Sequence, residues 1–391
     1  MRFEFASPGS IVFGPGSVRG AGEAAKALAP DSPQAFVVTG RDPSRAAALL
    51  ASLDEAGLAH AEYALGREPR FEEAREALAL ARDLSCGLVI GFGGGSALDL
   101  AKALAALLAN PGDPLDYAEV IGGGRSLAKP SLPCIAIPTT SGTGSEATRN
   151  AVLASSERGV KVSLRSATML PRLAIVDPEL CLGLPPDVTA ETGMDALTQL
   201  LEPFSCASPN PLVDALCREA LPRAFRSLPT VFREGGDLNA REDMCFASLS
   251  SGLALANARL GAVHGLAGPL GGMLPIPHGA ACAALLGPVV KANVAALRQR
   301  AKAHPALARY AEAASLARSE PLSDQSARAE DLGPILDNLA RELGIRGLGS
   351  FGLDRKAFPD LILKAEAASS MRGNPIVLTK DELWAILEEA I

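Results

Sequence analysis

The hydrophobic pattern of this 391-residue chain changes near residue 185. Before that point, short apolar runs rich in β-branched residues alternate with segments of helical periodicity, which is typical of buried parallel strands joined by helices. After it, the periodicity is helical almost throughout. The chain is also too long for one typical hydrophobic core. We therefore predict an α/β domain with a parallel sheet over residues 1–185 and an all-helical domain over residues 186–391.

The first domain is predicted to contain a sheet with helices between its strands. The predicted strands cover residues 35–39, 86–92, 135–138, 160–164 and 173–178, and the predicted helices cover residues 23–28, 44–56 and 97–108. Residues 3–13 carry apolar side chains on both sides of Pro8 and Gly9, a pattern that predicts a β-hairpin. The run over residues 173–178 is expected to close the sheet.

The second domain is predicted to be a series of helices. Thr189 has a side chain suited to an N-cap, and the helix that follows is expected to include residues 194–202. Further helices are predicted over residues 211–221, 240–256, 264–270, 280–286, 289–303, 305–316, 334–342 and 381–391. Residues 318–331 are polar and are predicted to form a loop.

Composition and charge argue against several classes of protein. The net charge is −7 and no dense run of lysine and arginine occurs, so nucleic acid is not expected as the main partner. No stretch of about 18 residues is free of charged residues and turn formers, so we predict no transmembrane helix. The first residues also lack the pattern of a secretory signal. The seven cysteines are scattered without a Cys-x-x-Cys pair, which favours buried reduced thiols in a cytoplasmic protein over disulfides or zinc ligands.

Three glycines, Gly93, Gly94 and Gly95, follow a predicted strand and precede a predicted helix. Glycines let a backbone approach a phosphate closely, and the free N–H groups at a helix N-terminus favour an anion. The alternative is an ordinary tight turn between strand and helix. Residues 139–146 follow another predicted strand and are rich in hydroxyls and glycines, as either a nucleotide-binding loop or an ordinary polar loop would be.

Two of the four histidines, His264 and His278, lie in glycine-rich segments. Asp195 and Gln199 are four residues apart, so a helix places them on one face. A carboxylate and two imidazoles brought together from separate helices are consistent with a divalent metal site. The alternative is that both histidines are hydrogen-bonded core residues.

These motifs together resemble the iron-containing (group III) alcohol dehydrogenase family, and the resemblance covers essentially the whole chain. In that family an aspartate, a histidine four residues later and two histidines fourteen residues apart hold Fe(II) or Zn(II). The corresponding residues here are Asp195, Gln199, His264 and His278, of which Asp195, His264 and His278 are implied to be catalytic. The resemblance also implies a Rossmann-like N-terminal domain and a helical C-terminal domain, as in dehydroquinate synthase-like proteins.

The chain departs from the family pattern at two positions. At Gln199 the family has a histidine, and an amide oxygen is a weaker, neutral ligand than an imidazole nitrogen. The site is therefore expected to bind metal loosely, to use the Gln199 oxygen, or to hold none. At Gly268 many members have a histidine near the substrate. Its absence removes a possible proton relay and suggests a bulkier or unusual substrate, or a slower enzyme.

The resemblance also implies which residues bind the nucleotide. The spacing Gly-Gly-Gly-Ser-x-x-Asp-x-x-Lys, which ends at Asp99 and Lys102, matches the pyrophosphate motif of the family. Asp99 is implied to lie near the nicotinamide. The other implied cofactor contacts are Gly93, Gly94, Gly95, Ser96, Thr139, Thr140, Thr143, Ser145, Lys161 and Leu182.

The choice between NAD and NADP depends on the residue that follows the strand over residues 35–39. Family members that prefer NAD commonly have an aspartate there, which can hold the ribose 2′-hydroxyl and would repel a 2′-phosphate. Here Gly40 and Arg41 occupy this place, and Arg45 follows one turn into the next helix. Because a small residue beside basic ones suits a phosphate, we expect NADP to be favoured. The alternative is that the arginines are two surface residues.

These features predict an NAD(P)-dependent alcohol dehydrogenase or aldehyde reductase. Hydride would move between the nicotinamide and a small alcohol or carbonyl substrate, with the help of a divalent metal in the cleft between the domains. Three alternatives stay open: a metal-independent reductase of the maleylacetate reductase type, a nucleotide-binding homologue with weak or no turnover, and a sugar-phosphate cyclase or related enzyme. The family commonly forms dimers, so a cytoplasmic homodimer is expected, and the predicted hairpin is able to pair across its interface.

Overall fold

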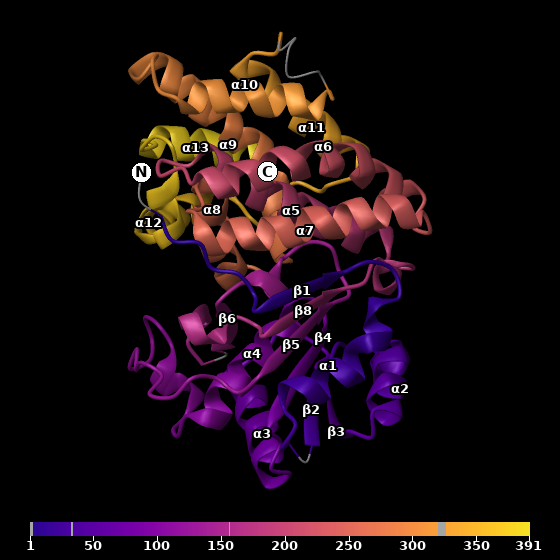
Figure 1. The fold of residues 1–391 in the computed structure, drawn as a ribbon. Helices are drawn as coiled ribbons and strands as arrows, with labels where there is room; N and C mark the ends of the chain where they lie inside the picture. The colour runs from indigo at the N-terminus through magenta and orange to yellow at the C-terminus, as the bar shows by residue number, and fades with distance from the viewer. Residues whose placement is uncertain (1–2, 33, 156, 320–325) are drawn as a thin grey trace. The chain divides into compact units, whose positions relative to one another are not determined.

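The computed structural model describes residues 3–32, 34–155, 157–319 and 326–391, which form two compact units (Figure 1). One unit, Ala6–Leu182, holds a parallel sheet. The other, Gly183–Ile391 together with residues 3–5, is helical in the part of the chain that the structure describes. Along the chain the units meet between Leu182 and Gly183, close to the change of hydrophobic pattern near residue 185.

The α/β unit is built on a six-stranded parallel sheet. Its strands are β1 (Ser10–Phe13), β2 (Gln34–Thr39), β3 (Ala59–Ala64), β4 (Leu88–Gly93), β5 (Cys134–Pro138) and β8 (Leu173–Val176). The order across the sheet is β1-β8-β5-β4-β2-β3, and every neighbouring pair is parallel. Strand β2 therefore lies between β3 and β4, so the order of strands along the chain reverses at β2.

Helices cover both faces of this sheet, which explains the continuous apolar runs of its central strands. The helices are α1 (Ala21–Leu28), α2 (Ala47–Glu55), α3 (Phe71–Asp83) and α4 (Gly95–Ala109). Successive residues of β2 point to opposite faces. Val37 packs in one hydrophobic cluster with Leu49 of α2, whereas Phe36 packs in another with Leu104 of α4. Both faces of the sheet are thus buried.

The predicted hairpin over residues 3–13 is wrong. The described residues before Ser10 form no strand, and β1 pairs in parallel with β8, with Ser10 opposite Leu173. The N–H of Gly9 donates to the backbone oxygen of Pro171 at 3.1 Å. β1 therefore pairs with a strand that is distant in sequence, which the local pattern does not reveal. Because β1 lies outside β8, the prediction that β8 closes the sheet is wrong as well.

The strand predicted over residues 160–164 is present but lies in a second, smaller sheet. This strand, β7 (Val160–Arg165), pairs antiparallel with β6 (Asn150–Ser155). The other strands and helices predicted for this unit are present, with ends that differ by a few residues.

The helical unit packs around one hydrophobic cluster. Its helices are α5 (Pro186–Ser205), α6 (Pro211–Arg233), α7 (Leu238–Asn257), α8 (Ala262–Met273), α9 (His278–Arg300), α10 (Ala306–Ala317), α11 (Leu332–Glu342), α12 (Phe358–Ala367) and α13 (Lys380–Ala390). Helix α9 contacts α5, α8, α11 and α13. By length and composition alone α9 is able to span a membrane, but 78% of its most apolar window is buried inside the protein, as in a core helix.

Several of these helices differ from the prediction. The helix expected to begin at Thr189 begins at Pro186, and the Thr189 hydroxyl accepts a hydrogen bond from Arg241 at 3.2 Å. The two helices predicted on either side of Pro288 are one helix, because burial of this segment outweighs the hydrogen bond that proline cannot donate. Helix α12 has no counterpart in the sequence prediction. The loop predicted over residues 318–331 lies partly outside the described residues.

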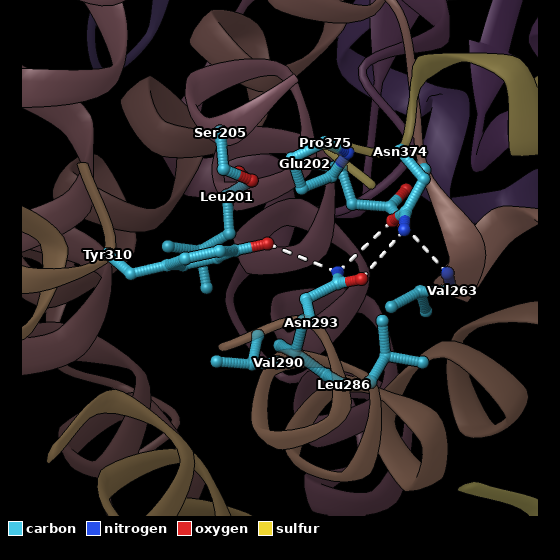
Figure 2. A pocket seen from close by; sticks show the side chains of 12 residues that line it. Leu201, Glu202, Ser205, Val263, Leu286, Val290, Asn293, Tyr310, Asn374 and Pro375 are labelled. Atoms are coloured by element: carbon cyan, nitrogen blue, oxygen red, sulfur yellow. Dashed lines mark hydrogen bonds between the residues drawn. The ribbon is translucent and has the colours of Figure 1, made fainter. Parts of the chain in front are cut away.

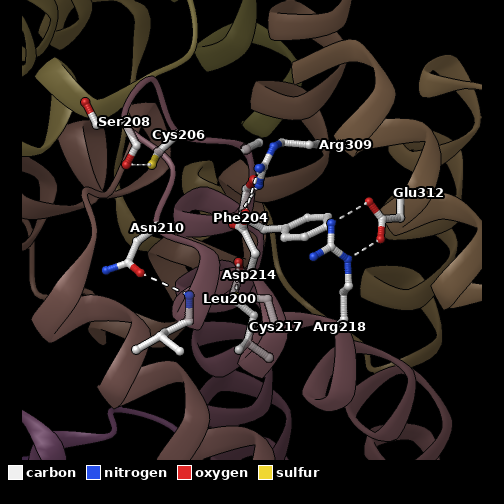
Figure 3. A network of polar contacts seen from close by, with 12 residues as sticks. Leu200, Phe204, Cys206, Ser208, Asn210, Asp214, Cys217, Arg218, Arg309 and Glu312 are labelled. Atoms are coloured by element: carbon white, nitrogen blue, oxygen red, sulfur yellow. Dashed lines mark hydrogen bonds and ion pairs between the residues drawn. The ribbon is translucent and has the colours of Figure 1, made fainter. Parts of the chain in front are cut away.

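Two arginines join α5, α6 and α10 at the aromatic ring of Phe204 (Figure 3). The guanidinium carbons of Arg218 and Arg309 each lie 5.3 Å from the centre of this ring. Arg309 donates to both carboxylate oxygens of Asp214, each at 2.7 Å. Arg218 pairs with Glu312 at 2.5 Å. Since Asp214 is almost fully buried, its charge depends on Arg309 for compensation.

Replacing Asp214 with alanine is expected to lower the free energy of unfolding of the helical unit by about 2–4 kcal/mol, because Arg309 would lose its buried partner. Trp384, the only tryptophan of the chain, lies in α13, so its fluorescence during denaturant titration reports this unit. Asp360→Ala removes an exposed pair with Lys364. This control is expected to change the unfolding free energy by less than about 0.5 kcal/mol. Equal effects of the two substitutions would contradict the role assigned to Asp214.

Candidate functional site

Three side chains predicted as metal ligands come together in the helical unit. Asp195 comes from α5, His264 from α8, and His278 is the first residue of α9. The Nε2 atoms of His264 and His278 lie 3.7 and 3.8 Å from Oδ1 of Asp195. The centres of the two imidazole rings are 5.4 Å apart. Packing of the three helices therefore brings a carboxylate and two imidazoles, distant in sequence, to one point.

The Asp195 carboxylate makes this cluster suited to a cation. Asp195 is 2% exposed, and its Oδ1 has no hydrogen-bond partner among the described residues. Burial alone raises the pKa of Asp195, but the two imidazoles and the Gln199 amide hold this pKa below its usual value. A buried anionic oxygen without a partner is costly unless a positive group compensates it. The donor set of one carboxylate and two imidazole nitrogens therefore fits a divalent metal such as Fe(II) or Zn(II).

Glu202, one helical turn beyond Gln199 in α5, fixes the orientation of His264. Its Oε2 lies 2.7 Å from Nδ1 of His264, and its Oε1 accepts the backbone N–H of Val263 at 2.7 Å. With Nδ1 bound to this carboxylate, Nε2 of His264 faces Asp195. Burial alone lowers the pKa of His264, but the Glu202 and Asp195 carboxylates outweigh burial and raise this pKa to about 10. The surroundings of His264 thus favour positive charge, and an outer carboxylate of this kind commonly orients a metal-binding histidine.

A network of side-chain amides supports the segment that carries His264 (Figure 2). Asn374 exchanges hydrogen bonds with Asn293 at 2.6 and 3.1 Å. It also accepts the backbone N–H of Ala262 at 3.2 Å. Asn293 also donates to the hydroxyl of Tyr310 at 3.1 Å. These groups line a cavity of about 10 Å³, which has room for about one water molecule. The network holds the N-terminus of α8, and with it His264, in a fixed position.

His278 is placed by a close approach of two helices. A Cβ atom on the next residue, Gly279, would lie 2.4 Å from the backbone oxygen of Glu191 in α5. Since only glycine permits this contact, the N-terminus of α9 lies directly against α5. The His278 side chain is nevertheless 42% exposed, so the cluster is accessible from this side.

Two further side chains lie beside the cluster: Gln199, which the sequence analysis predicted as a ligand, and Cys282, which it did not. The amide of Gln199, which stays a predicted ligand, hydrogen-bonds to Asp195. Cys282, one turn after His278 in α9, is fully buried and places Sγ 3.6 Å from Nε2 of His278. Four ligand atoms, one of them this sulfur, lie within 4.8 Å of one another. Sequence analysis missed Cys282 and Glu202, although spacings of four residues from His278 and seven from Asp195 place each on the ligand-bearing face of its helix.

The predicted phosphate-binding glycines lie where the strand order of the sheet reverses. Gly93, Gly94 and Gly95 connect β4 to α4, and Ser96 lies in the first turn of α4. Open α/β sheets bind ligands outside the carboxyl ends of the strands that flank such a reversal, which are β2 and β4 here. The N-cap of α4 is Gly94, which has no side chain. The N–H groups of the first turn are therefore oriented toward any anion bound at this helix end.

The second predicted loop packs directly on these glycines. Thr139, Thr140 and Thr143 lie against Gly93, Gly94 and Gly95, respectively. The N–H of Thr139 donates to the backbone oxygen of Gly93 at 2.9 Å. A Cβ atom on Gly95 would lie 2.8 Å from Cγ2 of Thr143, so only glycine allows the two loops to meet so closely. The structure thus brings both predicted nucleotide-binding segments together.

Asp99 and Lys102 join the second loop to α4. Asp99 Oδ1 accepts the hydroxyl of Ser145 at 2.5 Å, and Oδ2 accepts the backbone N–H of Val152 at 2.9 Å. Lys102 is fully buried, donates to the backbone oxygen of Ser145 at 3.0 Å and pairs with Asp99 at 3.0 Å. The spacing of these two residues on α4 therefore has a structural role: it fixes the position of Ser145 relative to the glycines.

Gly40 directly follows β2 at the same edge of the sheet. Because β2 and β4 pair in register, Gly40 adjoins Gly93. A side chain on Gly40 would meet no atom within 4 Å, so the space beside it is open. Arg41 and Arg45 are exposed and donate to backbone oxygens of neighbouring segments, at 3.1 and 2.5 Å respectively.

The remaining positions implied by the family resemblance lie apart from these loops in the sequence. Lys161 belongs to β7 and pairs with Glu68 at 2.7 Å. Leu182 is the last residue of the α/β unit and is partly buried. Their contacts with a cofactor stay predictions. Gly268 lies one turn after His264 in α8, is exposed, and has open space where a side chain would start.

Glu146 is a buried acid in the second loop that sequence analysis did not single out as a titrating group. It is 1% exposed, and its Oε1 has no hydrogen-bond partner among the described residues. Burial raises its pKa to about 7, against the opposing effects of a backbone hydrogen bond and of Lys102. Since this pKa lies above the ordinary value of 4.5, the folded protein binds the proton more tightly than the unfolded chain. Stability is therefore lost as the pH rises through this range.

Glu146→Gln is expected to raise the free energy of unfolding at pH 8 by about 1–3 kcal/mol, because it removes the cost of a buried charge. At pH 5 the folded protein already carries a neutral Glu146, so little change is expected. Urea titrations followed by far-ultraviolet circular dichroism at both pH values measure the difference. Glu72→Gln, at an exposed position of α3, is the control. An equal gain at pH 5 and pH 8 would refute the assignment.

Comparison with known proteins identifies the family. Residues 8–178 match the family model of iron-containing alcohol dehydrogenase, and residues 189–391 match the model of the C-terminal part of the Fe-containing alcohol dehydrogenase family. The chain is 34% identical to alcohol dehydrogenase 4 of Saccharomyces cerevisiae over 367 residues, which cover 92% of this chain and 91% of the relative.

Solved structures agree with this match. A 1,3-propanediol oxidoreductase superposes with a TM-score of 0.91 at 32% identity and covers 100% of both chains. A sulfoacetaldehyde reductase from Bifidobacterium kashiwanohense, in complex with NAD+, superposes with a TM-score of 0.86 at 29% identity and covers 100% of this chain and 99% of its own. Fold and relatives define an oxidoreductase that acts on CH–OH groups. The chain belongs to the iron-containing alcohol dehydrogenase family, so the resemblance and the predicted fold class are confirmed.

Proposed function

We propose that this protein is an NAD(P)-dependent alcohol dehydrogenase or aldehyde reductase that holds a divalent metal with Asp195, His264 and His278. One observation carries the proposal: the buried Oδ1 of Asp195 has no hydrogen-bond partner among the described residues and faces the Nε2 atoms of both histidines. This arrangement suits a cation between the three groups.

The side chains of the cluster have distinct proposed roles. The metal, when bound, would act as a Lewis acid on the substrate oxygen, which polarises a carbonyl or lowers the pKa of an alcohol. Asp195 supplies a buried negative charge that stabilises the ion, and Glu202 keeps Nε2 of His264 directed at it. His278 is the most exposed of the three ligands, so we propose that the substrate enters on its side.

The α/β unit is proposed to bind NADP(H) at the triglycine turn, and this cofactor would carry the hydride. The N-terminus of α4 suits the pyrophosphate. Gly40 places no carboxylate where a ribose 2′-phosphate would lie, and the guanidinium groups of Arg41 and Arg45 are near in sequence. Each guanidinium has five N–H donors, more than its bonds to backbone oxygens use. The relative that binds NAD+ supports a pyridine dinucleotide as the ligand.

Turnover with metal-loaded protein tests the proposed function directly. NADPH oxidation should be measured across a panel of small aldehydes and ketones, with chelator-treated protein and with protein reloaded with Zn(II) or Fe(II). Asp195→Asn is expected to lower the metal content and to reduce kcat/KM by at least about 100-fold, because it removes the anionic ligand. Asp187→Asn, at an exposed position in the first turn of α5, is expected to leave both unchanged.

The other outcomes of this experiment separate the alternatives. Full activity of the chelator-treated protein would contradict the metal role and favour the metal-independent reductase. Tight NADPH binding without turnover of any substrate would instead favour a nucleotide-binding homologue.

Gly40→Asp tests the cofactor preference. An aspartate fits the open space beside this residue and would repel a 2′-phosphate. We expect the ratio of kcat/KM for NADPH to that for NADH to fall by roughly 10- to 100-fold, which corresponds to about 1.4–2.7 kcal/mol. Gly236→Asp places the same charge at an exposed glycine with open space in the helical unit and should not change the ratio. A clearly higher kcat/KM of the wild-type protein for NADH than for NADPH would contradict the proposed NADP preference.

A further inference from the structure

We infer that Cys282 is a metal ligand, so that the metal site is built from Asp195, His264, His278 and a cysteine thiolate and prefers Zn(II) to Fe(II). This inference rests on the metal site of the proposed function and specifies its chemistry. It differs from the ligand set that the family resemblance implies, in which Gln199 and not Cys282 occupies the fourth position. The reasons are the position of the sulfur, the charge of the cluster and the chemistry of the donors.

The position of Cys282 is set by its helix. His278 and Cys282 are four residues apart in α9, so their side chains lie on one face, one turn apart. The Cys282 Sγ atom lies 3.6 Å from Nε2 of His278. The ligand atoms of Asp195, His264, His278 and Cys282 all lie within 4.8 Å of one another.

These separations are close to those of a tetrahedral zinc site. With Zn–N of about 2.05 Å and Zn–S of about 2.3 Å, a tetrahedron places nitrogen and sulfur about 3.5 Å apart and two oxygen or nitrogen ligands about 3.4 Å apart. The corresponding distances here are 3.6 Å from His278 to the sulfur, and 3.7 and 3.8 Å from the two imidazoles to Asp195. These three separations exceed the tetrahedral values by a few tenths of an ångström at most, and the other three ligand pairs lie within 4.8 Å.

A second observation, made on the Asp195 carboxylate, points to a ligand at this place. The Oδ1 of Asp195 is buried, lacks a hydrogen-bond partner among the described residues and is directed into the same cluster. The site therefore does not rest on a lone cysteine. With the thiolate, the site carries two negative charges, which balance the charge of a divalent ion in a buried environment.

The chemistry of the donors also favours the sulfur as a ligand. Cys282 is fully buried beside the two imidazoles and the carboxylate, where a bound metal ion would displace the thiol proton and hold the thiolate. Among the donors near Asp195, a thiolate is also much softer than the amide oxygen of Gln199, and soft donors favour Zn(II) over Fe(II), Mn(II) or Mg(II).

X-ray absorption of the zinc-loaded, full-length protein tests the inference directly. We expect the zinc edge to show one sulfur neighbour at about 2.3 Å together with nitrogen and oxygen neighbours. In the Co(II)-loaded protein we expect a thiolate-to-cobalt charge-transfer band in the near ultraviolet. Competition between Zn(II) and Fe(II) for the metal-free protein should leave predominantly zinc bound.

Variants test whether the sulfur ligand is that of Cys282. Cys282→Ser and Cys282→Ala should both lose the charge-transfer band and bind Zn(II) at least about 100-fold more weakly, since removal of an outer-shell partner alone already costs 10–100-fold. Cys217→Ala, which removes a fully buried thiol in α6 outside the cluster, should keep both the band and the affinity. Because the wild-type spectra do not depend on any variant, a variant that fails to fold leaves the test intact.

Each result decides between the inference and the proposed function. Stoichiometric zinc with only nitrogen and oxygen neighbours would overturn the thiolate ligand while leaving the metal-dependent function standing. Loss of the cobalt band in Cys217→Ala but not in Cys282→Ala would also overturn it. Protein that takes up neither Zn(II) nor Co(II) would overturn both the inference and the metal role in the proposed function.

Discussion

A buried carboxylate without a hydrogen-bond partner on one oxygen is the constraint around which the helical unit is arranged. Asp195 lies at the centre of α5. Burial of its charge lowers the stability of the fold unless positive or hydrogen-bond donor groups surround the carboxylate. Helices α8 and α9 bring the two imidazoles to within 4 Å of this carboxylate. The close contact of Gly279 with α5 and the amide network behind α8 fix the position of each histidine. The cluster is therefore held in place by the packing of the helices and by side-chain hydrogen bonds.

In the α/β unit, a rigid strand–turn–helix segment exposes backbone N–H groups where an anion is able to bind. The glycines after β4 leave the N-terminus of α4 without bulky side chains, and the hydroxyl-rich loop packs directly on them. This loop is held by a buried lysine and by an aspartate whose two oxygens are both engaged. Asp99 and Lys102 thus support this loop through α4, while the contact of Asp99 with the nicotinamide that the family resemblance implies stays a prediction.

Local patterns predicted most elements and several residues of the candidate sites, and several of the errors share one physical cause. The buried parallel strands, the triglycine turn and the helices of the second unit were predictable because periodicity and glycine spacing are local properties. The supposed hairpin before Phe13 was wrong because β1 pairs with β8, about 160 residues away along the chain. Pro288 did not end α9 because the burial of that helix depends on its neighbours in space. Glu202 and Cys282 were missed because their partners, His264 and His278, are recognised as neighbours only through helical spacing combined with packing.

The sequence by itself determined the division into an α/β and a helical part, the family, and the glycines, aspartate and histidines that define the candidate sites. These follow from spacing and residue chemistry, which do not require coordinates. Only the tertiary structure decided which donors face one another. It placed a cysteine sulfur beside the imidazole of His278 and a second carboxylate behind His264, because the distance between two side chains on different helices depends on how closely those helices pack.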